Sequence, residues 1–249
     1  MLFKLLAVYI LPFLVLYAVN QVSMQLKLAA AGEATSGMTP EELVNSLGGL
    51  YPNLLVSVMF NIFVQSLLAA LLYTYVKVYL ERGRGSFAGA DVSSQLFSHS
   101  LKVIGISFAV TLMAGVGLMF FILPGIIIAN SLSLALFIAV FENKGIGESL
   151  SRSWNLVRRQ WWSTLTLNLL GILIVWMISI TLTLPGAIHD AFAGATPDYS
   201  GGIDSIPKWR LLMLGVAITG GSLGSVFPFL FLAFQYFNLT EREAKELNP

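Results

Sequence analysis

Few residues of this chain have side chains that could do chemistry, and they form no recognisable catalytic set. The chain has two histidines, His99 and His189, and no cysteine. His189 precedes Asp190, but neighbours of this kind more often form a solvated pair in a loop than part of a Ser-His-Asp triad. The lack of cysteine excludes thiol nucleophiles, disulfides and thiolate metal sites. We therefore expect no enzymatic activity, no metal site and no cofactor.

The chain is much more apolar than a soluble domain. Of its 249 residues, 56% are hydrophobic and 11% are charged, whereas soluble domains have roughly 25% charged residues. So much apolar surface cannot be hidden in one water-soluble core, and the lipid bilayer must act as part of the solvent. The net charge of +1 gives no indication of nucleic-acid binding, and we expect none.

Long apolar segments define the expected architecture. A helix needs about 20 apolar residues to cross a bilayer. The segments that reach or approach this length lie near residues 5–19, 54–76, 103–123, 126–141, 165–184 and 211–237. The sequence thus predicts an all-α polytopic transmembrane helical bundle, about six spans in three hairpins, as a single integral membrane domain over residues 1–249. The first segment could equally be an uncleaved signal anchor, and its short leader points to a native start upstream of Met1.

The distribution of Lys and Arg predicts the orientation. If the N-terminus is cytoplasmic, 11 of the 14 basic residues lie in the cytoplasmic ends and loops, and only Lys27, Lys208 and Arg210 lie outside. Cytoplasmic loops of membrane proteins carry the excess of Lys and Arg. We therefore expect both termini in the cytoplasm.

The tripeptide Leu-Pro-Gly occurs twice, each time at the end of a span. Proline lacks a backbone N–H and glycine accepts a positive φ, so the sequence predicts outer-face hairpin turns at Pro124, Gly125, Pro185 and Gly186. A polar segment precedes each of these spans, and the two segments, near 91–100 and 145–160, are predicted to be cytoplasmic interfacial amphipathic helices. The repeat reflects either common ancestry or only the suitability of Leu-Pro-Gly for ending a helix.

The segment 145–160 has the clearest amphipathic pattern. Ile146, Leu150, Trp154, Val157 and Trp161 recur at helical spacing and predict one apolar face. Tryptophan is enriched at headgroup depth, and each arginine near anionic lipid contributes about 1 kcal/mol. The predicted lipid-interface residues are Arg152, Trp154, Arg158, Arg159, Trp161 and Trp162. Alternatively, this helix only connects two spans and its charges set the topology.

Amide side chains occur inside the predicted spans at Asn61, Gln65, Asn130 and Asn168. Amides in hydrocarbon need partners, so these buried polar residues are expected to hydrogen-bond across helices and hold the bundle together. The alternative is a polar pathway lined by the same four residues. Gly220 and Gly224 have the spacing that lets two helix backbones approach closely.

One stretch of the chain resembles a known family. Residues 123–129 read Leu-Pro-Gly-Ile-Ile-Ile-Ala, and Glu142, Gly145, Glu148, Ser149, an Arg-Ser-Trp at 152–154 and a Trp pair at 161–162 follow. This pattern resembles the membrane-domain family named after glycerophosphodiester phosphodiesterases and the YciC-type bacterial inner-membrane proteins, most firmly over residues 102–166. The resemblance implies a polytopic protein of the bacterial inner membrane, in a group mostly without assigned activity. In the namesake enzymes a separate soluble domain carries the chemistry, so phosphodiesterase activity is not implied.

Two classes of function follow. The first is a bundle without catalysis that interacts with lipid or scaffolds partners in the bacterial envelope. Its expected partners are membrane lipids, anionic ones among them, and a second copy or another membrane protein. The second is a transporter or lipid-translocating protein with a polar pathway between hairpins. No ionisable residue lies in the predicted spans, which weighs against an ion-coupled carrier because such carriers usually keep one there.

Overall fold

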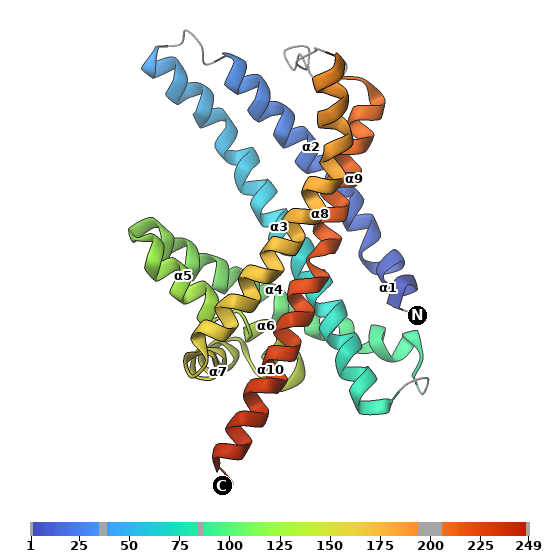
Figure 1. The fold of residues 1–249 in the computed structure, drawn as a ribbon, viewed down its shortest axis with the longest axis vertical. Helices are drawn as coiled ribbons and strands as arrows, with labels where there is room; N and C mark the ends of the chain where they lie inside the picture. The colour runs from blue at the N-terminus through green and yellow to red at the C-terminus, as the bar shows by residue number, and fades with distance from the viewer. Residues whose placement is uncertain (1, 35–38, 84–86, 194–205, 248–249) are drawn as a thin grey trace. The chain divides into compact units, whose positions relative to one another are not determined.

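The regular secondary structure of the protein is helical throughout the part that the computed structural model describes, residues 2–34, 39–83, 87–193 and 206–247 (Figure 1). The helices are α1 (Leu2–Tyr9), α2 (Leu11–Ala34), α3 (Pro40–Arg82), α4 (Gly89–Phe120), α5 (Ile122–Ser131), α6 (Ala135–Phe141), α7 (Ile146–Arg158), α8 (Trp161–Ala193), α9 (Lys208–Gly224) and α10 (Val226–Leu247). They form two compact units. Unit 1 comprises Met1–Ile10, Gln65–Ile174 and Ser225–Pro249, and unit 2 comprises Leu11–Val64 and Val175–Gly224.

Five helical segments among the described residues are long and apolar enough to cross a membrane. They are Gly48–Arg82, Gly89–Phe120, Ile122–Phe141, Trp161–Phe192 and Lys208–Glu246. Together they contain most of the second to sixth predicted spans, and they make the chain a multi-pass membrane protein. The first predicted segment is interrupted at Ile10, between α1 and α2. Helix α2 is not one of the five, because Asn20, Gln21 and Gln25 lower its hydropathy.

The hairpin between α4 and α5 reverses at Phe121 and not at the predicted Pro124 and Gly125. Phe121 is extended, with φ −158° and ψ 142°, and the two predicted residues lie in the first turn of α5. Proline is tolerated there because the first N–H groups of a helix have no intrahelical partner. A Cβ at Gly125 would lie 2.6 Å from Leu118 Cδ2, and one at Gly117 would lie 2.9 Å from Gly125 Cα. Gly117 and Gly125 thus allow α4 and α5 to approach each other closely.

Pro185 and Gly186 do not form the predicted turn either. Helix α8 continues through Pro185 and ends at Ala193. In hydrocarbon, proline forfeits one backbone hydrogen bond, whereas leaving the helix there would expose several unsatisfied backbone groups. The predicted separate interfacial helix near 91–100 is also absent, because these residues are the first turns of the unbroken α4. Asp91 accepts a hydrogen bond from Ala88 N at 2.7 Å and fixes the start of α4.

Unit 1 has an apolar core in which Ile106 of α4 packs against Ala135 and Ala139 of α6. Next to it, the buried Tyr73 ring of α3 meets Phe137 of α6 edge to face, at 5.0 Å between centroids. In Figure 1 the α4–α5 hairpin appears as a pair of adjacent helices. Phe121 there is 72% exposed. The core therefore lies at the base of the hairpin.

Unit 2 packs α2, the first part of α3, the last part of α8 and α9. Three glycines of α9 face α8: Gly220 approaches Leu182, a Cβ at Gly221 would lie 2.7 Å from Ser179 Oγ, and one at Gly224 would lie 3.2 Å from Ile178 Cδ1. Small residues let membrane helices approach closely and gain van der Waals contact. The glycine pair at 220 and 224 therefore lies at a close contact between α8 and α9.

Candidate functional site

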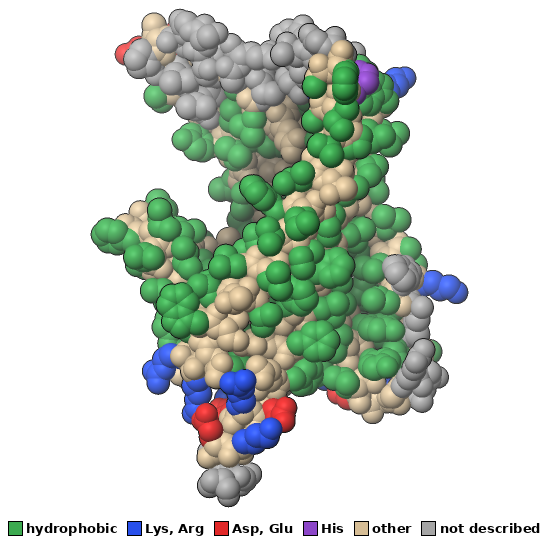
Figure 2. Space-filling view, in the orientation of Figure 1, with side chains coloured by type: hydrophobic (Ala, Val, Ile, Leu, Met, Phe, Trp, Pro, Cys, Tyr) green, Lys and Arg blue, Asp and Glu red, His purple; other side chains and the backbone are tan. Residues whose placement is uncertain are grey.

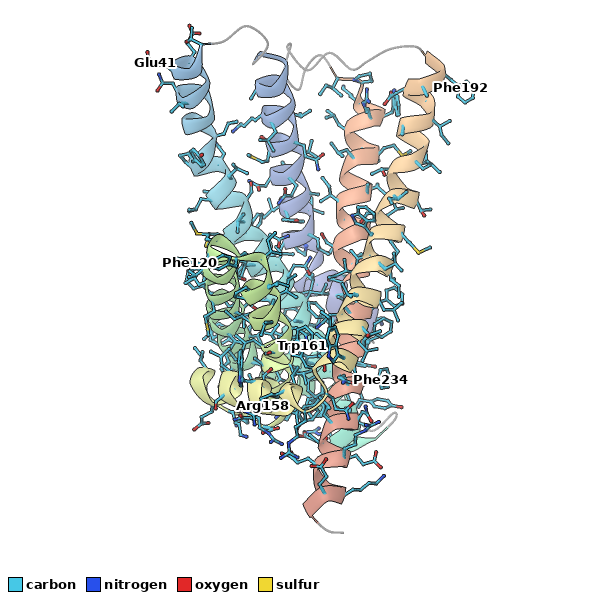
Figure 3. All side chains as sticks on the ribbon, turned by 60° about the vertical axis from the view of Figure 1, so that its left-hand side comes forward. Glu41, Phe120, Arg158, Trp161, Phe192 and Phe234 are labelled. Atoms are coloured by element: carbon cyan, nitrogen blue, oxygen red, sulfur yellow. The ribbon has the colours of Figure 1, made fainter. Side chains whose placement is uncertain are left out.

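Helix α7 is a short, separately capped helix in unit 1. Gly145 precedes it, and the Gly145 backbone N donates to Glu148 Oε2 at 3.4 Å. Glu148 in the first turn and Arg158 in the last complement the helix dipole. Figure 3 shows α7, labelled at Arg158, lying crosswise to α5 of the same unit. This matches the helix predicted for 145–160, except that Trp161 already belongs to α8.

The buried face of α7 differs from the predicted apolar stripe. Ser149, Ser153, Leu156 and Val157 are buried, whereas Ile146 and Trp154 are exposed to 44% and 38%. Serine is small enough to bring α7 against α5, and Ser153 Oγ donates to the Ser131 carbonyl at 2.8 Å. The hydrophobic pattern missed this face because serine counts as polar. A pair of small residues four apart was the signal that could have found it.

Arg152 is bound to two carboxylates of the protein. Its Nη1 and Nη2 donate to the two oxygens of Glu243 at 2.9 and 2.5 Å. Its Nε lies 3.5 Å from Glu142 Oε1. The hydrogen bonds that Arg152 donates to Glu243 raise the pKa of Arg152 further above its already high ordinary value. Arg152 therefore stays charged and ties α7 to α10 and to the end of α6.

Glu142 is the second centre of this charged network. Tyr236 Oη donates to its Oε1 at 2.8 Å, and Lys144 Nζ lies 2.5 Å from its Oε2. Partial burial raises the pKa of Glu142, but the hydrogen bonds from Lys144 and Tyr236 and the charges of Lys144 and Arg152 outweigh it and leave this pKa below its ordinary value. Sequence reasoning missed the network because bonded members such as Glu142 and Tyr236 are 94 positions apart. The sequence signal that could have indicated this network is the presence of a glutamate at the end of an apolar segment.

The other predicted lipid-interface residues differ in whether they have a partner in the protein. Arg159 pairs with Glu246 at 2.5 Å, and both are exposed. Arg158 is exposed and has no ion-pair partner among the described residues. Trp162 is 75% exposed, and its ring meets Trp161 edge to face at 4.9 Å. Figure 2 shows basic and acidic side chains gathered around the end of unit 1 that holds α7 and the C-terminal turns of α10.

The predicted buried amides each have a partner within their own unit. Asn130 Nδ2 donates to the Trp161 carbonyl at 3.1 Å, and Asn168 Nδ2 donates to Asn130 Oδ1 at 2.8 Å. Gln65 Oε1 accepts from Ser225 Oγ at 2.7 Å in unit 1. In unit 2, Asn61 Nδ2 donates to Tyr17 Oη at 2.6 Å. The structure thus brings Asn130 and Asn168 together and joins helices through these side chains.

No group of three His, Cys, Asp or Glu able to hold a metal occurs in the described ranges. His99 Nδ1 lies 2.9 Å from Thr74 Oγ1, which gives the buried imidazole a neutral partner. The His189 ring lies 4.5 Å from that of Trp209 between centroids, tilted by 59°, and His189 Nδ1 lies 3.6 Å from Asp190 Oδ1. The two histidines belong to different units, and neither contacts a nucleophile paired with a carboxylate.

Comparison with known families gives one match. The sequence pattern of the family described as Domain of unknown function (DUF7847) matches residues 22–234. This covers most of the chain, so the chain belongs to that family. The comparisons with curated proteins and with solved structures gave no match.

Proposed function

We propose that this member of the DUF7847 family is a non-catalytic multi-pass protein of the bacterial inner membrane that binds anionic lipid at its cytoplasmic face through α7. One observation supports this most: Arg158 is exposed and has no ion-pair partner among the described residues, and the exposed Trp154 and Trp162 lie four positions before and after it in the chain. Such residues suit the headgroup layer, where tryptophan anchors and arginine meets phosphate. The arginines at 152 and 159 are ion-paired and serve helix docking instead.

The remaining elements of the proposal concern location and partners. The positive-inside distribution supports both termini in the cytoplasm, with α2 completing six spans. The resemblance to the phosphodiesterase membrane-domain family supports a bacterial inner membrane. Uncovered apolar side chains such as Met119, 88% exposed, and Phe192, 89% exposed, supply surface for lipid, a second copy or another membrane protein. The buried amides bond to neighbouring helices, which favours this bundle over a transporter with a polar pathway.

Lipid titration of single arginine variants tests the proposal. The purified full chain in detergent is titrated with phosphatidylglycerol and with phosphatidylcholine, and binding is read from tryptophan fluorescence. Arg158→Gln should weaken binding of phosphatidylglycerol by about fivefold, because one arginine near anionic headgroups contributes about 1 kcal/mol. The matched control is Arg159→Gln, which removes an arginine that is already paired with Glu246. Equal effects of the two variants, or no effect of Arg158→Gln, would contradict the proposal.

A further inference from the structure

Unit 2 contains a cavity of about 350 Å³ between α2, α8 and α9. Such a volume falls at the lower end of the roughly 300–1,000 Å³ typical of small-molecule sites. Apolar side chains line much of it, among them Leu26, Leu182, Met213 and Leu214. Leu182 and Leu214 belong to two of the helices that are apolar enough to span a membrane. This part of the cavity can therefore receive a hydrocarbon chain.

The polar residues that line the same cavity include an ion pair between Arg210 of α9 and Asp190 of α8. Both side chains are largely covered, with 21% and 23% exposure. A guanidinium has five N–H donors, and among the described residues only Asp190 accepts from that of Arg210, at Nη2. Asp190 therefore orients a guanidinium that lines the cavity and can donate to a ligand there.

The ion pair is not explained by helix stability. Arg210 lies in the first turn of α9, and Asp190 lies in the last turn of α8. The helix dipole favours anions at the first turn and cations at the last, so both residues lie at the unfavourable end. An anionic ligand group beside Arg210 would be favoured by the guanidinium and by the start of α9 together.

The residues around the pair are typical of the membrane interface. The rings of Trp209 and His189, which adjoin Arg210 and Asp190 in the chain, lie 4.5 Å apart between centroids. Tryptophan beside charged residues marks headgroup depth. The cavity thus has an anion-binding end at headgroup depth and an apolar end toward the hydrocarbon. We propose that it binds one phospholipid, with the phosphodiester at Arg210 and an acyl chain along Leu182 and Leu214. This site is in unit 2 and does not depend on the lipid contact proposed for α7.

A cavity-filling substitution with a matched control tests the site. Gly186 lines the cavity, and a Cβ there would meet no atom within 4 Å, so Gly186→Leu fills the space without a backbone clash. A Cβ at Gly215 also meets nothing within 4 Å, but this residue does not line the cavity, so Gly215→Leu is the control. The full-length protein is incubated in detergent with phosphatidylglycerol, and retained lipid is counted by native mass spectrometry. Wild type and Gly215→Leu should each retain one tightly held phospholipid.

We expect Arg210→Gln to reduce this retention by about tenfold or more, since hydrogen bonds to charged groups contribute about 1.5–3 kcal/mol. Gly186→Leu should reduce it by a similar factor, because the leucine side chain fills the space that the lipid would occupy. Diacylglycerol, which lacks the phosphate, should not be retained, and inorganic phosphate should not compete. Gly186→Leu should reduce retention by the same factor in the wild type and in an Arg158→Gln background, which separates this site from α7. Unchanged retention in Gly186→Leu, equal retention of diacylglycerol, or displacement by inorganic phosphate would each overturn the proposal. If Arg210→Gln fails to fold, Gly186→Leu still decides the question.

Discussion

Replacing Arg152 with glutamine should destabilise unit 1 by separating α7 from α10. Glutamine is shorter, uncharged and unable to donate to both oxygens of Glu243 in parallel. The change leaves the carboxylates of Glu243 and Glu142, which are 22% and 19% exposed, without their shared cation. Tyr236 and Lys144 still hold Glu142. The loss therefore falls mainly on the contact with Glu243.

The size of this loss follows from the exposure of the pair. Exposed ion pairs contribute about 0.2–1 kcal/mol, and removing one partner of a fully buried pair costs about 3–5 kcal/mol. The Arg152–Glu243 pair, with side chains 27% and 22% exposed, lies between these limits. We expect Arg152→Gln to lower the free energy of unfolding by about 2 kcal/mol. For a chain of this length that corresponds to a fall in Tm of about 4–8 °C.

The assay is thermal unfolding of the purified variants in one detergent, followed by circular dichroism. Arg159→Gln, which removes the exposed pair with Glu246, is the matched control and should lower Tm by about 2 °C or less. In the double variant Arg152→Gln with Glu243→Gln, the loss should be smaller than the sum of the single losses. Equal Tm shifts for Arg152→Gln and Arg159→Gln would refute the reasoning, because burial would then make no difference.

Two further predictions concern pH and topology. The pKa of Glu142 is lowered in the folded protein, so its contribution to stability should be complete above the ordinary glutamate pKa of about 4.3 and be lost as pH falls below that value through the folded pKa. Glu142→Gln should flatten this part of the Tm-against-pH curve. An equally steep fall of Tm in the variant would show that other groups cause the acid destabilisation. With six spans and both termini inside, cysteines introduced at Lys4 and Ser151 should be protected from an impermeant thiol reagent in intact cells, whereas one at Ala191 should react. Labelling at Lys4 would show that α2 does not cross the membrane.

The sequence predicted the spanning helices well because hydropathy over about 20 residues depends on the bilayer and not on neighbouring helices. It predicted the turns poorly. Pro124 and Pro185 each follow a leucine and precede a glycine, yet Pro124 lies in the first turn of α5 and Pro185 lies inside α8. Proline allows both positions, and the packing of Gly125 on Leu118 distinguishes them. Such packing is tertiary and leaves no local signal.

The site was predicted only in part, for a related reason. Periodicity correctly indicated a helix over 145–160, but it ranked faces by hydrophobicity and so missed the buried serines at 149 and 153. The partners of Arg152 and Arg159 lie 91 and 87 positions further along the chain, beyond any local pattern. Amide bonding between Asn130 and Asn168 followed from a general rule, since amides in hydrocarbon need partners. Which amides would meet depended on the fold.

Helical geometry explains why α7 can dock on α10 and still leave Arg158 outside the contact. Arg152 and Arg159 are seven residues apart, so they lie within about 20° of each other around the helix. Their partners Glu243 and Glu246 are three residues apart, about one turn of α10, so both arginines pair with the C-terminal turns of α10. Arg158 is six residues from Arg152 and lies about 120° away around the helix, outside that contact. Substitution of Arg158 should therefore change lipid binding without loosening the helix pair.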